Sequence, residues 1–137
     1  EKNAGLDPAP VDDALVPRVT FCEPEIASVG LTEAKAKEVH GADAVTTAEF
    51  NVAGNAKSQI LGAQGFVKLV SLKDGPIVGF HAIGARMGEQ VGEGQLIVNW
   101  EADADDVAAL VHAHPTQNET LGEAAMALAG KPLHNHG

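Results

Sequence analysis

Two residue types suited to proton transfer stand close together near the C-terminal end of the chain. His114 is followed directly by Pro115, and Glu119 comes one helical turn later in a segment of helix-forming residues. A carboxylate that binds one imidazole nitrogen fixes the tautomer of the ring and stabilises the imidazolium when a proton arrives. The pair therefore indicates an acid–base site, of the kind that can deprotonate a thiol for disulfide exchange.

The same residues also fit an ordinary helix start. Thr116 and Glu119 have the spacing of a capping box, with Thr116 as N-cap, and Pro115 would fix how the chain enters the helix. In this interpretation the carboxylate binds backbone amides, and only His114 is left without a role. The residues themselves leave both interpretations open. The His114–Pro115 peptide bond is also a candidate for the cis form.

Histidines occur in two His-x-His pairs, His112/His114 and His134/His136. On a strand, the two rings of such a pair would share one face, as some metal sites require. Neither pair is predicted to lie in a strand, and no cysteine or carboxylate stands at a recognised ligand spacing nearby. We therefore predict no metal site.

Two further features could suggest chemistry but have simpler interpretations. The single cysteine, Cys22, excludes an internal disulfide and fits a reducing compartment. It lacks neighbours that would stabilise a thiolate, so we predict a small core or partly buried residue. The segment at 84–94, GARMGEQVGEG, lacks the glycine spacing of a dinucleotide fingerprint, so we expect its glycines to permit close packing rather than phosphate binding.

Composition narrows the classes of protein and of partner. The 137 residues suffice for one domain, and 45% hydrophobic with 20% charged residues is typical of a globular protein. A net charge of −10 argues against nucleic acid, and it fits either a basic protein partner or a merely solvated surface. No apolar run approaches the roughly 18 residues of a membrane span, and no signal peptide is evident, so we expect no membrane association and a cytoplasmic location.

The first half of the chain is predicted to form strands. Runs of β-branched and aromatic residues are separated by segments typical of turns. The sequence KDGP at 73–76 predicts an antiparallel hairpin around it. One helix is expected among the strands, at 32–41, with Thr32 as N-cap and Gly41 at its end. The predicted strands cover 19–22, 26–30, 44–52, 65–72 and 76–84.

The second half is predicted to be helical, at 87–101, 103–113 and 120–130. In the last helix the apolar residues fall on one face: Leu121, Ala124, Ala125 and Leu128. Strands grouped before helices predict an α+β fold, with helices packed on a mainly antiparallel sheet. We expect residues 1–16 to be a linker or arm, residues 17–133 to form the domain, and residues 134–137 to be a tail.

Two long motifs resemble one known family. The sequence HAHPTQNETLGEAAMALAGKPL (112–133) is similar to the C-terminal segment of dihydrolipoamide dehydrogenases, which are flavin-dependent pyridine nucleotide–disulfide oxidoreductases. The sequence VPRVTFCEPEIASVGLTEAKA (16–36) resembles the start of the interface, or dimerisation, domain of that family. The two motifs occur in the family's order and the resemblance covers nearly the whole chain, so the chain is identified as a member.

The resemblance implies a role for each residue of the opening motif. His114 corresponds to the family's catalytic base and Glu119 to the carboxylate that orients it. Pro115 corresponds to a proline whose cis bond places the His114 carbonyl beside the FAD of the partner subunit. In the family, the base accepts a proton from dihydrolipoamide, the thiolate attacks a redox disulfide, and electrons pass through FAD to NAD.

The resemblance also implies cofactors and partners outside these residues. The family's Cys-x4-Cys disulfide, its dinucleotide fingerprint and its NAD-binding half are absent, so FAD and NAD are expected only in a longer parent chain. This fragment alone is expected to bind no cofactor and to be inactive. The implied partners are a second copy in a homodimer, the flavin- and NAD-binding domains of the parent, and the acyltransferase core of a 2-oxo acid dehydrogenase complex.

Two alternatives remain compatible with the sequence. The domain can act solely as a dimerisation and docking module, or it can belong to a glutathione-reductase-like or other disulfide reductase. The His-Ala-His-Pro-Thr motif favours the lipoamide branch. The mercuric reductases end in a cysteine pair that is missing here.

Overall fold

The computed structural model describes residues 2–134, and within them five strands form one antiparallel sheet. The strands lie in the order β1-β2-β5-β4-β3, and every neighbouring pair is antiparallel. The hairpin predicted around the KDGP turn is confirmed, since β4 and β5 are paired on either side of it. The strands are β1 (Arg18–Thr20), β2 (Glu25–Gly30), β3 (Val45–Asn51), β4 (Phe66–Leu72) and β5 (Ile77–Gly84).

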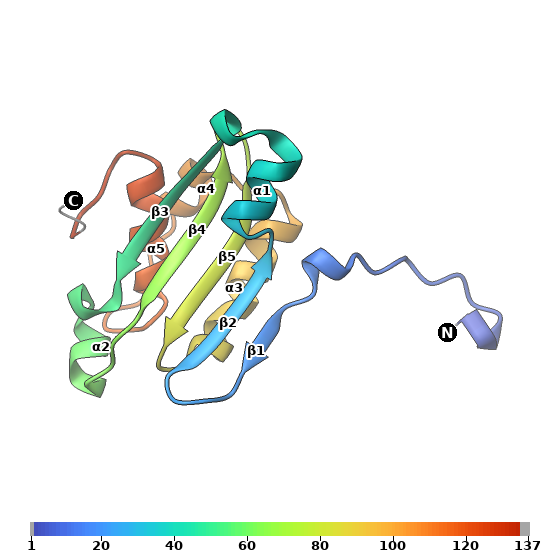
Figure 1. Ribbon diagram of the computed structural model, residues 1–137. Coiled ribbons are helices and arrows are strands. Elements are labelled where there is room, and N and C mark those ends of the chain that lie inside the picture. The colour runs from blue at the N-terminus through green and yellow to red at the C-terminus, as the bar shows by residue number, and fades with distance from the viewer. Residues whose placement is uncertain (1, 135–137) are drawn as a thin grey trace.

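Helices lie on both faces of this sheet, and one face carries most of them. Helix α3 packs across β2 and β5, and α5 packs across β3 and β4. Figure 1 shows these two helices and α4 behind the sheet, with α1 on the opposite face. The predicted α+β class, with helices on an antiparallel sheet, is confirmed. The helices are α1 (Glu33–His40), α2 (Ala56–Leu61), α3 (Met87–Asn99), α4 (Ala104–Ala108) and α5 (Glu119–Leu128), and short 3-10 turns occur at Lys2–Ala4, Asp13–Leu15, Ala42–Ala44 and Val52–Gly54.

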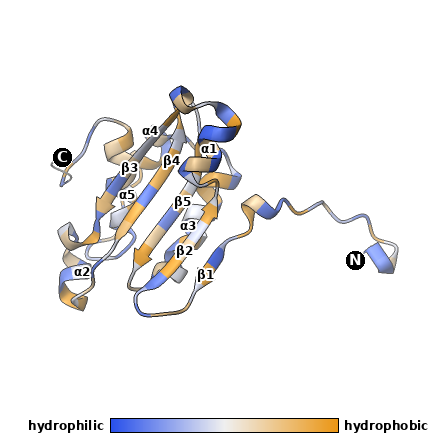
Figure 2. Cartoon of the chain, in the orientation of Figure 1, coloured by the Kyte–Doolittle hydropathy of each residue, from blue (hydrophilic) through white to orange (hydrophobic). Residues whose placement is uncertain are grey.

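The main core lies between the sheet and α3, α4 and α5. Side chains of a strand point alternately to its two faces, so Phe80 and Ala82 of β5 enter this core while His81 points to the other side. Hydrophobic and hydrophilic residues accordingly alternate along the strands (Figure 2). Full burial of a side chain such as Phe80 or Leu121 contributes about 1.5–3 kcal/mol, which makes this layer the main source of stability.

Helix α1 is attached to the other face by a smaller core and by ion pairs. Ala36 on α1 packs with buried residues of β3 and β4. Glu33 accepts hydrogen bonds from Lys37 on its own helix and from Lys68 on β4, at 2.7 Å for Lys68. These two bonds lower the pKa of Glu33 to about 2. The Glu33 carboxylate therefore links α1 to β4 beside the small core around Ala36.

The helix predicted at 103–113 is much shorter in the structure. Asp103 and Asp106 form a capping box that starts α4, but the helix ends at Ala108. Beyond it the chain turns back toward α3, where His112 meets Glu93. This long-range contact competes with local helix propensity and ends the helix. The structure also contains α2, which the sequence analysis missed, with Asn55 as its N-cap.

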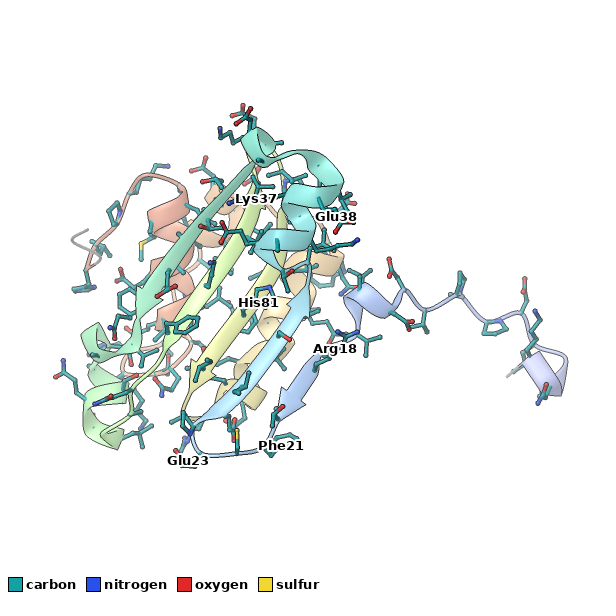
Figure 3. The ribbon with its side chains drawn as sticks, viewed as in Figure 1. Arg18, Phe21, Glu23, Lys37, Glu38 and His81 are labelled. Carbon is teal, nitrogen blue, oxygen red and sulfur yellow. The ribbon has the colours of Figure 1, made fainter. Side chains whose placement is uncertain are left out.

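The prediction that Cys22 is a core or partly buried residue is wrong. Strand β1 ends at Thr20, whose partner is Ile26, so residues 21–24 form the connection between β1 and β2. Cys22 is exposed there, and its thiol donates to the carbonyl of Pro24 at 3.0 Å. Figure 3 shows the neighbouring Phe21 at this turn, at the periphery of the molecule.

The glycines of the 84–94 segment serve packing at some positions only. A Cβ atom at Gly94 would lie 2.7 Å from the ring of Phe80, so α3 can approach β5 only with glycine at this position. A Cβ atom at Gly88 would lie 3.1 Å from the side chains of Val19 and Phe21. Gly92 has no atom within 4 Å of such a position. The glycines thus permit close packing at Gly88 and Gly94, but the nearest atoms there are side chains and not another backbone, and Gly92 has no close neighbour.

The N-terminal part of the described chain extends away from the domain before it joins the core. Figure 1 shows the segment before residue 13 running away from the sheet. Leu15 and Val19 pack against the main core, so the chain joins the domain at these residues. Among residues 2–134, no helix combines the length and the apolar composition needed to cross a membrane.

Candidate acid–base site

His114 and Glu119 meet at the junction between the loop that follows α4 and the first turn of α5. The Nδ1 atom of His114 lies 2.9 Å from Oε1 of Glu119. The side chain of His114 is 70% exposed and that of Glu119 is 24% exposed. The peptide bond between His114 and Pro115 is cis. The carboxylate thus holds one ring nitrogen, while Nε2 has no hydrogen-bond partner within residues 2–134 and faces outward.

The second carboxylate oxygen of Glu119 binds the backbone. Oε2 accepts a hydrogen bond from the amide of Thr116 at 2.8 Å, which is one half of a capping box. The other half is missing, because the Thr116 hydroxyl donates to the carbonyl of Ala113 at 2.6 Å. The prediction of Thr116 as N-cap is therefore wrong: α5 begins at Glu119, with Asn118 in the N-cap position. One carboxylate serves both the helix start and the imidazole.

Buried polar contacts fix the loop that carries His114. The side-chain oxygen of Gln117 accepts from the Ser58 hydroxyl at 2.6 Å, and its amide nitrogen donates to the carbonyl of Ala85 at 3.2 Å. The side chain of Asn55 donates to the carbonyl of Thr116 at 3.0 Å. Helix α2 and the end of β5 therefore hold the residues that separate His114 from Glu119.

The electrostatics favour an ionised Glu119 beside the imidazole. Partial burial would raise the pKa of Glu119, but the hydrogen bonds from the Thr116 amide and from His114 lower it below the ordinary value. The ionised carboxylate therefore faces Nδ1 of His114 and orients the ring.

A second histidine–carboxylate pair lies beside the first and was missed by sequence analysis. Nε2 of His112 lies 2.7 Å from Oε1 of Glu93 on α3, and the Asn118 side chain donates to Oε2 of Glu93 at 2.7 Å. The hydrogen bond with Glu93 raises the pKa of His112, against the opposing effect of burial. No local spacing could reveal this pair, since its members come from different elements.

The His-x-His pairs do not converge on a common centre. His112 and His114 bind different carboxylates, and Nδ1 of His134 lies 2.5 Å from Glu123. His136 lies outside the described residues. In the described part of the chain, no group of three or more histidine, cysteine or acidic side chains could hold a metal ion.

The start of α3 is occupied by a carboxylate of the chain itself. The amide of Gly88 donates to Oε2 of Glu25 on β2 at 2.8 Å. A phosphate bound at this helix N-terminus would need the same amide. The contact therefore favours the packing role of the 84–94 segment.

Sequence comparisons relate this chain to known proteins. Residues 16–125 match the family described as pyridine nucleotide-disulphide oxidoreductase, dimerisation domain. The chain is 42% identical to a dihydrolipoyl dehydrogenase of Bacillus subtilis over 130 residues, which are 93% of this chain and 27% of that protein. It is 40% identical to a dihydrolipoyl dehydrogenase of Rhizobium etli over 136 residues, which are 97% of this chain and 28% of that protein. The chain thus spans little more than a quarter of these relatives.

Solved structures share the fold at lower sequence identity. LpdA from Mycobacterium tuberculosis superposes with a TM-score of 0.83 at 22% identity, over 93% of this chain and 28% of that chain. The HOCl-induced flavoprotein disulfide reductase RclA from Escherichia coli superposes with a TM-score of 0.74 at 20% identity, over 80% of this chain and 25% of that chain. The arrangement of one antiparallel sheet with these helices therefore recurs within longer chains.

Proposed function

Because this chain belongs to the family of pyridine nucleotide-disulphide oxidoreductase dimerisation domains, we propose that it supplies His114 and Glu119 as the acid–base pair of a dihydrolipoyl dehydrogenase. The observation that carries this proposal is the 2.9 Å contact between Nδ1 of His114 and Glu119, with the rest of the ring exposed. A base of this kind can serve a reaction centre outside its own domain. The site is complete only when a second subunit covers it.

The proposed step is a proton transfer coupled to thiol–disulfide exchange. Nε2 of His114 takes the proton of one thiol of dihydrolipoamide, and the ionised Glu119 stabilises the imidazolium. The resulting thiolate attacks one sulfur of the partner subunit's disulfide, and the other sulfur leaves as a thiolate. The second thiol loses its proton and attacks the lipoamide sulfur of the mixed disulfide, which breaks as the lipoamide disulfide forms. The cysteine sulfur leaves as a thiolate, so both of the partner's cysteines are reduced.

FAD and NAD belong, in this proposal, to the other domains of the parent enzyme. In the described part of this chain, His114 is 70% exposed, and the adjacent Pro115 lines an open hollow together with Lys57 and Arg86. That exposure fits a flavin held by the partner subunit. When bound, FAD carries electrons from the reduced cysteines to NAD.

The homodimer surface is proposed to include exposed apolar residues beside this loop. Trp100 is 75% exposed and Val111 is 98% exposed, and Leu96 and Leu110 are also exposed. Leu96 follows Glu93 by about one helical turn on α3, and Val111 precedes the His112 that binds Glu93. Leu96, Leu110 and Val111 are therefore close to the acid–base loop along α3 or along the chain, and we propose that a second copy buries them together with His114.

Replacing Glu119 with glutamine in the full-length enzyme tests the acid–base assignment. The glutamine oxygen can still accept from the Thr116 amide, but its NH2 group then faces Nδ1 of His114. This arrangement places the imidazole proton on Nε2, the nitrogen that must accept a proton. We expect turnover with dihydrolipoamide to fall by about tenfold to a hundredfold, in steady-state kinetics normalised to bound flavin.

Glu123→Gln is the matched control for this variant. Glu123 lies one turn further along α5 and also binds a histidine, His134. We expect its turnover to remain within about twofold of the unmodified enzyme. Equal losses in Glu119→Gln and Glu123→Gln would contradict a specific role for Glu119.

A second candidate function is docking to the acyltransferase core of a 2-oxo acid dehydrogenase complex. The net charge of −10, with exposed Asp105 and Asp106 on α4, favours a basic docking segment. Binding of the dimeric enzyme to the acyltransferase should weaken about tenfold or more between 50 and 500 mM salt, as measured by calorimetry. An affinity that does not change with ionic strength would exclude this electrostatic docking.

A further inference from the structure

Glu93 connects two ends of the loop that carries His114. One of its oxygens lies 2.7 Å from Nε2 of His112, which precedes His114 by two residues. The other oxygen accepts from Asn118, which precedes Glu119 by one residue. A single side chain on α3 therefore binds one residue before His114 and one residue between His114 and Glu119.

The ring of His112 is held against α5 as well as against α3. A Cβ atom at Gly122 would lie 2.7 Å from Nδ1 and 2.9 Å from Cε1 of His112, so only a glycine leaves room for the ring. The side chain of His112 is 12% exposed, whereas that of His114 is 70% exposed. His112 is thus a fixed anchor, and His114 projects from it.

The segment between these anchors is also closed on itself. The Thr116 hydroxyl donates to the carbonyl of Ala113, and the Thr116 amide donates to Glu119. These bonds shape the inside of the loop, but they do not attach it to α3. Among the hydrogen bonds of residues 2–134, only those of Glu93 with His112 and Asn118 join this loop to the long helix α3.

We propose that Glu93 is a positioning residue, which clamps the loop through His112 and Asn118 so that Nε2 of His114 is held at the partner subunit's disulfide. This inference rests on the function proposed above. It assigns to Glu93 no contact with substrate or cofactor. A base displaced by about 1 Å from its working position can lose about 10²-fold in rate, so the orientation of the loop matters as much as the presence of His114.

Glu93→Ala in the full-length enzyme removes both contacts and keeps a good helix former. We expect kcat with dihydrolipoamide, per bound flavin, to fall about tenfold, with the KM for NAD unchanged. Oxidation of NADH by a dye that takes electrons directly from the flavin bypasses His114, and we expect it to stay within about twofold. Glu93→Gln keeps an acceptor for Asn118 and places its NH2 group at Nε2 of His112, which then accepts if the His112 proton moves to Nδ1, so this variant should restore most of kcat.

Two further variants make the test decisive. Glu89→Gln is the control, since Glu89 is exposed on the same helix, and it should leave both activities unchanged. Gly122→Ala disturbs the same clamp from α5 by displacing the His112 ring, and should reproduce the selective loss even if Glu93→Ala folds poorly.

The outcomes separate the clamp from a merely structural role and from the proposed function. A normal kcat in Glu93→Ala, or in Gly122→Ala where Glu93→Ala does not fold, overturns the clamp. Parallel losses of the dihydrolipoamide and dye activities overturn it as well, because they indicate general damage. If His114→Gln is itself fully active, the proposed function fails. If His114→Gln is inactive while the clamp variants are normal, only the role of Glu93 is wrong.

Discussion

Replacing His114 with glutamine in the full-length enzyme is expected to lower turnover with dihydrolipoamide by about 10²- to 10⁴-fold. Glutamine resembles histidine in size and polarity, but its amide cannot accept a proton near neutral pH. The side chain of His114 is mostly exposed in this chain, so its replacement removes little packing. The loss should therefore appear in proton transfer, while the fold and the bound flavin persist.

The measurement combines steady-state kinetics with the flavin absorbance spectrum. We expect a flavin content equal to that of the unmodified enzyme and an unchanged rate of NADH oxidation by an artificial dye. His134→Gln is the matched control, because His134 is also an exposed histidine bound to a glutamate of α5, and it should stay active. Near-normal turnover of His114→Gln would refute the assigned role.

Replacing Phe80 with alanine is expected to lower the free energy of unfolding by about 3–5 kcal/mol. Phe80 is completely buried in the centre of the main core, on the central strand β5. Its ring lies against Gly94 of α3, so its loss leaves a cavity that neither element can close without moving. Urea denaturation of the 137-residue chain, followed by circular dichroism, measures the change.

Phe21→Ala provides the control for Phe80→Ala. Phe21 is 81% exposed at the turn between β1 and β2, so its replacement should cost less than about 1 kcal/mol. Similar losses in the two variants would mean that the layer between sheet and helices is not the main source of stability in this chain.

Local patterns in the sequence were sufficient to predict most of the fold. Runs of β-branched and aromatic residues between turn signals located all five strands, and the KDGP turn predicted the pairing of β4 with β5. Thr32 was recognised as an N-cap because its hydroxyl satisfies an amide three residues along, a purely local interaction. Leu121, Ala124 and Ala125 are buried as the helical spacing predicted.

The errors arose where long-range contacts outweigh local preference. The helix predicted at 103–113 ends at Ala108, since His112 is drawn to α3. Cys22 follows a strand-like run, yet β1 ends before it and leaves it exposed. Helix α2 was not predicted, because it has only six residues and its buried residue, Ser58, is polar, so no apolar helical pattern marks it.

The candidate site was predictable only in part, for the same reason. His114 and Glu119 are five residues apart, so their contact at 2.9 Å could be anticipated from the sequence. Glu93 and His112 belong to different elements, so no sequence spacing relates them. The glycines around Glu93 were interpreted only in terms of helix packing. The sequence analysis treated a contact of Glu119 with backbone amides and a contact with His114 as alternatives. Both contacts occur, because one oxygen of Glu119 binds His114 and the other binds the Thr116 amide.

Mixing two inactive full-length variants tests the central claim, that His114 of one subunit serves the disulfide of the other. One variant carries His114→Gln and the other lacks a redox cysteine, and the subunits are exchanged at equal amounts. If the base acts across the interface, each mixed dimer regains one intact site, and activity should recover to about a quarter of that of the unmodified enzyme. If His114 serves its own subunit, no intact site can form, and a mixture that stays inactive despite verified mixed dimers would contradict the account.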